Sequence, residues 1–90
     1  MVRRKANKIK ELLVRGSFRF GTHAEFRTQD RMVTEFDLMC VGRTSKTLKN
    51  YEDGRWKVIG FDEDGCEIKV ICRLSDDQDS LFIISVIDEF

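Results

Sequence analysis

Cationic side chains alternate with apolar ones along two predicted strands in the second half of the chain. Successive side chains of a strand point to opposite faces, so Lys57, Lys69 and Arg73 share one face while the apolar residues between them enter the core. Cations held on neighbouring strands bind phosphate groups and neutralise the charge that develops when a phosphate ester is cleaved. The spacing therefore predicts a phosphate-binding face on a sheet.

Three apolar residues, Ile59, Phe61 and Ile71, lie on the same predicted face and would form the floor beneath the cations. Arg55 begins the first of the two strands and adds a fourth positive charge to this face. The simpler interpretation is a solvated sheet surface whose cations pair with Glu67, an arrangement that contributes little to stability.

His23 is the only histidine of the chain and the side chain best suited to proton transfer at neutral pH. It follows Thr22 at a predicted helix start, where the positive end of the helix dipole disfavours the imidazolium form. His23 is therefore a better candidate for a general base than for an acid. The alternative is that the Thr22–Glu25 segment is an ordinary capping box in which His23 only packs. Arg27, on the same helix, is a candidate to support phosphate binding.

The net charge of zero conceals a division along the chain. Residues 1–57 carry 14 Lys or Arg against 7 Asp or Glu, whereas residues 58–90 carry 2 against 9. Such asymmetry is typical of a protein that binds a polyanion through its basic half. The acidic residues also fit solvated turns, so both interpretations hold together.

Length and composition predict one globular domain over residues 1–90, since a chain of 90 residues supports one small core. Three cysteines without paired spacing favour reduced thiols, and we expect neither a disulfide framework nor a metal or other cofactor. The chain contains no apolar stretch of membrane-spanning length and no apolar run behind Met1–Lys5. We therefore expect a cytoplasmic protein with no membrane partner.

Three apolar runs, residues 55–61, 66–74 and 81–87, are separated by the turn-forming segments 62–65 and 75–80. This pattern predicts an antiparallel three-stranded meander. The middle run places its cysteines, Ile68 and Val70 toward the core. The third run is apolar on both faces, which predicts a strand that is partly covered on both sides and flanked by others.

The first half of the chain is predicted to supply helices. An apolar stripe over residues 2–15 indicates an amphipathic helix that ends at Gly16. Residues 17–20 alternate like a strand, placed at the sheet edge or beside the third run. The Thr22–Glu25 capping signal opens a helix over residues 23–32.

Residues 34–37 repeat the capping signal and open a shorter helix through Val41, closed by Gly42. Its buried stripe is expected to be Phe36, Met39 and Cys40. Residues 43–53 are polar and indicate a loop or an irregular strand. The whole order predicts an α+β fold in which helices pack on one face of a mainly antiparallel, three- to four-stranded sheet.

Several short motifs stand in this same order: Lys8–Leu13, Glu35–Cys40, Lys49 ahead of Trp56, and Ile68–Val70. Together they resemble the MqsR-type mRNA interferases, which belong to the larger RelE/ParE-like toxin fold. The Thr22–Ala24 segment, followed by arginines on the same helix, is also similar to small uncharacterised domains placed in that fold group.

The resemblance implies a RelE-like fold and a ribosome-independent endoribonuclease, a hydrolase that acts as the toxin of a bacterial toxin–antitoxin pair. It implies two partners, RNA and a cognate antitoxin protein that often carries a zinc-binding domain. The functional lysines of the family match Lys49 and Lys69. A family tyrosine has no match, because Gly60 and Phe61 occupy its neighbourhood. Tyr51 is the candidate to supply an acid or a stacking ring from another position.

Metal-independent RNA cleavage needs a base for the ribose 2′-hydroxyl, cations for the developing charge and an acid for the leaving oxygen. The candidates for catalysis are Lys69, Lys49, His23 and Tyr51, and those for substrate binding are Lys57, Arg73, Arg27 and Arg55. The alternative function is a non-catalytic member of the fold that binds nucleic acid or protein, or a ParE-like toxin that acts on DNA gyrase by binding.

Overall fold

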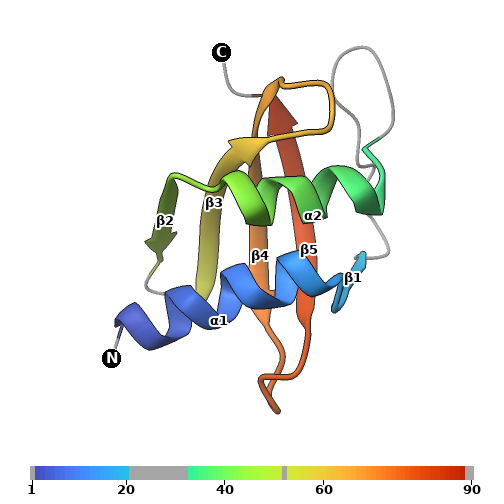
Figure 1. Cartoon of the computed structure of the whole chain (residues 1–90). Helices are drawn as coiled ribbons and strands as arrows, with labels where there is room; N and C mark the ends of the chain where they lie inside the picture. Colours follow the sequence, from blue (N-terminus) through green and yellow to red (C-terminus); the bar gives the residue numbers. More distant parts are fainter. Residues whose placement is uncertain (1, 21–32, 52, 89–90) are drawn as a thin grey trace.

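Two helices cover one face of a single five-stranded sheet in the computed structural model, which describes residues 2–20, 33–51 and 53–88 (Figure 1). The elements are α1 (Val2–Arg15), β1 (Phe18–Phe20), α2 (Glu35–Thr44), β2 (Thr47–Asn50), β3 (Arg55–Phe61), β4 (Glu67–Leu74) and β5 (Leu81–Asp88). The predicted α+β class is confirmed. The expected strand number is wrong, because short strands at both edges extend the meander to five.

The strand order is β1-β5-β4-β3-β2, and the predicted antiparallel meander forms its centre. β2 pairs antiparallel with β3, so part of the polar segment 43–53 is an edge strand. β1 pairs parallel with β5, with Phe18 opposite Leu81, and makes the sheet mixed. The predicted strand at residues 17–20 therefore lies beside the third run, one of its two expected positions.

Helix α1 ends where its sequence predicts. Gly16 has a φ of 77°, a left-handed conformation that glycine adopts without steric cost. The Gly16 N–H donates to the Leu13 carbonyl at 3.1 Å, and the Ser17 N–H donates to the Leu12 carbonyl at 2.9 Å. These two bonds form a Schellman motif, which directs the chain from α1 into β1.

Helix α2 begins with the predicted capping box. Thr34 Oγ1 accepts from the Asp37 N–H at 3.2 Å, and the Asp37 carboxylate accepts from the Thr34 N–H at 2.9 Å. The other carboxylate oxygen of Asp37 accepts from the Glu63 N–H at 3.0 Å, which ties this end of α2 to the β3–β4 turn. The buried Asp37 thus caps the start of α2 and links it to the sheet by a hydrogen bond.

The expected end of α2 is wrong, and its expected buried stripe is correct only in part, since Met39 and Cys40 are half-buried but Phe36 is not. The helix continues through Gly42 to Thr44, and α1 packs closely against it at Gly42, where a Cβ would lie 2.7 Å from the Leu13 Cβ. The face that meets α1 and the sheet therefore carries Leu38, Val41 and Gly42, whereas Phe36 is 55% exposed.

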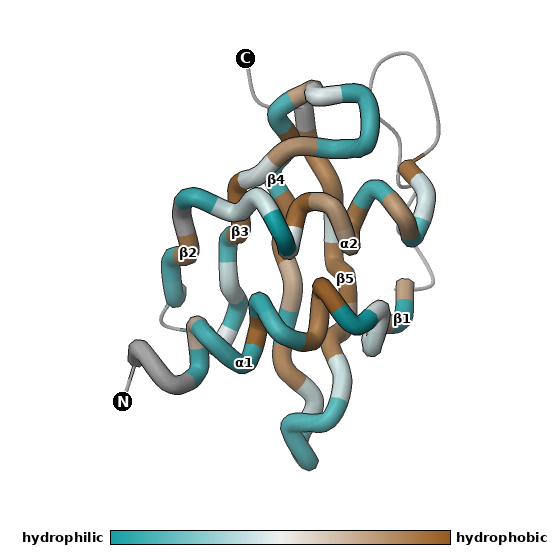
Figure 2. Tube along the Cα trace, viewed as in Figure 1, coloured by the Kyte–Doolittle hydropathy of each residue, from teal (hydrophilic) through white to brown (hydrophobic). Residues whose placement is uncertain are grey.

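The core lies between the helices and the inner face of the sheet, the face covered by α1 and α2. Apolar side chains of both helices form one buried cluster with those of β3, β4 and β5. Figure 2 shows the hydrophobic residues along the two helices and the central strands. The buried strand residues include Trp56, Val58, Ile68, Val70 and Cys72.

Two predictions for the meander strands need correction. Cys66 was expected in the core but is exposed, because it lies in the β3–β4 turn before β4 begins. β5 is flanked by β1 and β4 as predicted, but it is not covered on both sides, since Phe82, Ile84 and Ile87 are exposed. A bulge in the β4–β5 ladder, where Ile71 pairs with Ser85 and the next β4 residue pairs with Ile83, leaves Ile84 without a partner.

The segment 62–65 forms a tight hairpin turn, as its sequence predicts. The Asp62 N–H donates to the Cys66 carbonyl at 2.9 Å, and Gly65 adopts a φ of 84°. In the described ranges, no group of three His, Cys, Asp or Glu side chains is placed to hold a metal ion. None of the helices in those ranges is long and apolar enough to cross a bilayer.

Candidate nucleic-acid interface

The predicted cations gather on the outer face of the sheet, the face opposite the two helices. On β3 and β4 the inward positions are buried, and the alternate positions are partly or fully exposed. We call this surface the cationic face, which consists of Lys49, Arg55, Lys57, Lys69 and Arg73. Its cations come from three neighbouring strands, as the alternation in the sequence predicted for two of them.

Like charges oppose one another directly at two places on the cationic face. Lys49 on β2 pairs in register with Lys57 on β3, and Arg55 on β3 pairs with Arg73 on β4. The Cβ atoms of directly opposed residues lie roughly 4.5–5.5 Å apart, and like charges at this separation destabilise the ladder. The strand register thus concentrates positive charge at some cost to stability.

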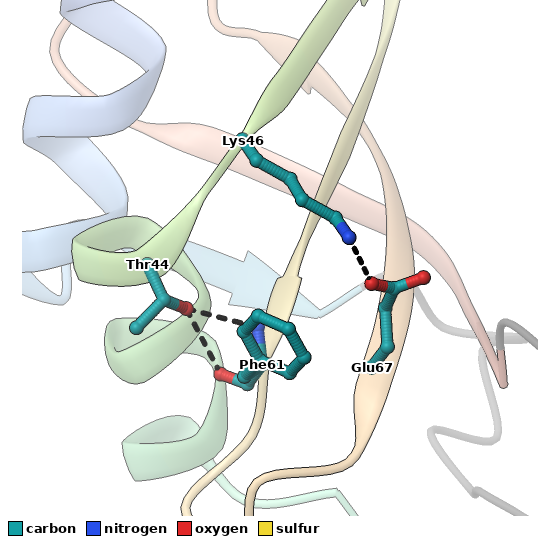
Figure 3. Close-up of polar contacts among 4 residues, drawn as sticks. All are labelled: Thr44, Lys46, Phe61 and Glu67. Atoms are coloured by element: carbon teal, nitrogen blue, oxygen red, sulfur yellow. Dashed lines mark hydrogen bonds and ion pairs between the residues drawn. The ribbon is translucent and has the colours of Figure 1, made fainter.

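The lysine pair, Lys49 and Lys57, is not compensated by an acid of the described residues. In the part of the chain that the structure describes, no carboxylate forms an ion pair with Lys49 or Lys57. The nearby Lys46 differs, since its ammonium forms an ion pair with the Glu67 carboxylate and lies 5.4 Å from the centre of the Phe61 ring (Figure 3). Glu67 therefore pairs with Lys46, which was not among the cations expected to pair with it, and forms no ion pair with the lysine pair in the described residues.

Thr44, at the end of α2, fixes the strand beneath this region. Its Oγ1 accepts from the Phe61 N–H at 2.9 Å and lies 3.3 Å from the Phe61 carbonyl oxygen (Figure 3). A Cβ on Gly60 would lie 2.7 Å from the Val41 carbonyl oxygen. The helix therefore packs directly on the β3 backbone, which holds the opposite face of that strand in a fixed position.

The arginine pair is bridged by Asp53 in the β2–β3 turn. The Arg55 Nε lies 2.7 Å from the Asp53 carboxylate, and an Arg73 guanidinium nitrogen donates to the Asp53 carbonyl at 3.2 Å. The hydrogen bond from the Arg55 backbone N–H, together with the charges of Arg55 and Arg73, lowers the pKa of Asp53. The two guanidiniums are thereby oriented at the end of the sheet while remaining exposed.

Tyr51 lies between cations at the end of β2. The Lys49 Nζ is 5.7 Å and the Arg55 Cζ is 5.5 Å from the centre of the Tyr51 ring, distances typical of cation–π contacts. The Tyr51 N–H donates to the Arg55 carbonyl at 2.8 Å and closes the turn. Four candidates predicted from sequence, Lys49, Tyr51, Arg55 and Arg73, thus meet at one end of the cationic face.

Lys69 lies on the same face but farther along it. It pairs with Ile59 on β3 and Ile87 on β5, whereas Lys57 pairs with Ile71. Lys57 and Lys69 are therefore diagonal neighbours, about 7–8 Å apart. Arg73 lies four residues along β4 from Lys69, a distance of about 13 Å at the rise of a strand. The predicted pair of catalytic lysines, Lys49 and Lys69, is thus separated by one strand.

Apolar side chains continue this face beyond the cations. Ile59, Phe61 and Ile71 are half-buried between the charged residues, as predicted for its floor. On β5 the exposed fractions of Phe82 and Ile87 are both 46%. The outer face therefore divides into a cationic side on β2–β4 and an apolar side on β5.

Two of the predicted site residues, His23 and Arg27, lie outside the described residues. Asp53, which orients the two arginines, was not among the predicted site residues, because an acid in a turn is usually only solvated. The pairing of Lys49 with Lys57 was also missed. The only sign of this pairing in the sequence was the alternation of polar and apolar residues over 47–50. That stretch is too short to distinguish a strand from a loop.

Comparisons with protein-family models, with curated proteins and with solved structures found no match to this chain.

Proposed function

We propose that this chain binds single-stranded RNA on the cationic face and cleaves it without a metal ion, as an endoribonuclease of RelE-like fold. The observation that carries the proposal is the direct opposition of Lys49 and Lys57, which no acid of the described residues compensates, beside the Arg55–Arg73 pair. Such clustering lowers stability in the isolated protein, and a bound phosphate chain would relieve the repulsion. Single-stranded RNA fits because exposed bases can contact Tyr51 and the apolar floor while phosphates contact the cations.

The proposed reaction transfers one proton at each end of a phosphate ester. A base removes the proton of the ribose 2′-hydroxyl, whose oxygen bonds to phosphorus while the bond from phosphorus to the 5′-oxygen breaks. The leaving oxygen takes a proton, which gives a cyclic phosphate and a 5′-hydroxyl. The lysine pair and Lys69 stabilise the charge on the phosphate, His23 is the candidate base and Tyr51 the candidate acid.

The biological role that we propose is the one that the MqsR-type resemblance implies. The chain would act in the cytoplasm as the toxin of a toxin–antitoxin pair and cut mRNA. A cognate antitoxin protein would neutralise it. The apolar side of the outer face, with Phe82 and Ile87 exposed beside the cations, is a surface that such a partner would cover.

The test is RNA cleavage by the purified chain in the presence of EDTA, with the chemical ends of the products mapped. We expect cleavage that resists the chelator and leaves cyclic phosphates. Lys69→Ala should slow cleavage by about 10²-fold, because loss of one electrostatic donor at a reacting phosphate costs about that much. The matched control is Lys10→Ala on the exposed surface of α1, which should cleave at the normal rate.

The second candidate is an RNA-binding protein without catalytic activity. One observation favours it: β3 lies between Lys69 on β4 and the Lys49–Tyr51 segment, so these groups do not converge as closely as a cleavage site requires. RNA that stays intact while binding to the protein would support this candidate. Cleavage by Lys69→Ala at the wild-type rate would mean that the proposed site is wrong.

A further inference from the structure

An open pocket adjoins the cationic face at the end of the sheet. Its volume is about 460 Å³, within the range of roughly 300–1,000 Å³ that is usual for ligand sites. It lies where the β2–β3 turn, the β4–β5 loop and the first half of α1 meet, and its lining includes Lys5, Asn50 and Trp56. Tyr51 and Arg73 line the same pocket, so it is continuous with the cationic face.

Polar side chains in this pocket have unused hydrogen-bonding capacity. In the described part of the chain, no hydrogen bond or ion pair engages the side chains of Asn50, Asp76 or Gln78. The neighbouring Asp77 differs, because its carboxylate accepts from the Ser75 hydroxyl at 2.6 Å and from the Asp79 N–H at 3.1 Å. The pocket thus offers one carboxylate and two amides to a ligand.

The chemistry of these groups selects among the four RNA bases. An ionised carboxylate only accepts hydrogen bonds, whereas an amide both donates and accepts. Guanine alone presents two adjacent N–H donors, the ring imino group and the amino group, on its pairing edge. Adenine, cytosine and uracil each place an acceptor atom beside their donor, and that atom would face the carboxylate. Asp76 therefore favours guanine over the other bases.

We propose that this pocket accepts one guanine base of the bound RNA, with the Asp76 carboxylate accepting from its imino and amino groups. The inference rests on the proposed RNA-binding function and adds base specificity to it. Unstacked bases of single-stranded RNA are recognised in this manner, by hydrogen bonds to their edges and by stacking on aromatic rings. Tyr51, on the pocket wall beside Lys49, supplies the ring.

The test uses 12-nucleotide, 2′-O-methyl oligouridines that carry a single G, A or C at the centre and resist 2′-hydroxyl cleavage. Binding is measured by fluorescence anisotropy at several salt concentrations. The G-containing strand should bind about tenfold more tightly than the others, the usual discrimination of a paired hydrogen bond to a base edge. Asp76→Asn should abolish this preference, and Asp79→Asn, which makes the same charge change in the same loop outside the pocket, should keep it.

A second variant separates recognition from folding. Gln78 has a φ of 61°, a conformation that glycine adopts at lower cost, so Gln78→Gly removes the amide without straining the loop. It should reduce the preference for guanine while the fold stays intact. Salt-dependent binding with no base preference, or a preference that survives Asp76→Asn, would overturn the guanine pocket alone. Absence of any salt-dependent binding would overturn the RNA-binding function as well.

Discussion

The substitution Lys57→Gln should stabilise the protein and weaken its RNA binding at the same time. Lys57 opposes Lys49 directly across the β2–β3 ladder, with no acid to compensate in the described residues. Relief of such a like-charge pair contributes roughly 0.2–1 kcal/mol at low salt, and the gain should shrink as salt screens the two charges. A misfolded variant would lose both stability and RNA binding. Damage to the fold therefore cannot produce a gain in stability together with a loss of binding.

The effect on RNA follows from counterion release. Each phosphate contact with a single strand contributes about 0.7 to the slope of log K against log salt concentration. Lys57→Gln should lower that slope by about 0.7, and the double variant Lys49→Gln/Lys57→Gln by about 1.4. Each contact thus accounts for a loss of about 2.6-fold in affinity between 50 and 200 mM salt.

Both quantities are measurable on the same samples. Trp56 is the only tryptophan and is 2% exposed, so its fluorescence reports urea unfolding, and fluorescence anisotropy of a labelled oligonucleotide reports binding. The control is Lys10→Gln, which makes the same change in net charge on the exposed surface of α1, on the other side of the sheet. If Lys57→Gln and Lys10→Gln give equal salt slopes, the lysine pair does not contact RNA and the reasoning is refuted.

Two further predictions concern the fold and its thiols. Gly42→Ala should lower the free energy of unfolding by roughly 1–3 kcal/mol, since the new Cβ would lie 2.7 Å from the Leu13 Cβ. At an exposed helical glycine the same substitution raises the free energy of unfolding by about 1 kcal/mol, and that result would mean that the two helices do not meet at Gly42. Cys66 should react with a thiol reagent in the native protein and Cys72 only after unfolding, because burial raises the pKa of Cys72 from 9.0 to about 12. The stability that this shift provides is complete below pH 9 and is lost as the pH rises toward 12, which urea unfolding at several pH values would measure.

The sequence predicted best those structural features that depend only on neighbouring residues of the chain. Gly16 marked the end of α1, and the Thr34–Asp37 capping box marked the start of α2, because each motif satisfies backbone groups of its own helix. The alternation along β3 and β4 placed Lys57, Lys69 and Arg73 on one face for the same reason, since side-chain direction in a strand is a property of neighbouring residues.

The buried face of α2 could not be predicted in this way. Hydrophobicity favoured Phe36, but the contact with α1 is made at Gly42, which allows close approach because it has no side chain. Two helices approach each other most closely where a small residue lies on the shared face. A hydropathy pattern does not mark a glycine as a contact residue. Phe36 lies in the first turn of α2 and remains exposed.

The opposition of charges at the candidate site depends on strand β2, which the hydropathy pattern of the sequence did not define. Lys49 faces Lys57 because β2 adds to the meander by antiparallel pairing over four residues. A segment this short acquires its structure from its neighbour, so its register follows from the tertiary fold. Arg55, Lys57, Lys69 and Arg73 were predictable on this face, whereas the position of Lys49 on it, directly opposite Lys57, was not.

The pairing of β1 with β5 joins the two ends of the chain. Phe18 lies beside Leu81, so the pairing of β1 with β5 cannot form until residues 81–88 have left the ribosome. The β2–β3, β3–β4 and β4–β5 hairpins close through short turns and can form earlier, because a short loop loses little entropy on closure. The strands that carry the lysine pair would thus assemble before the sheet is complete. Truncation of the last eight residues of the sheet, Leu81–Asp88, would remove two strands instead of one.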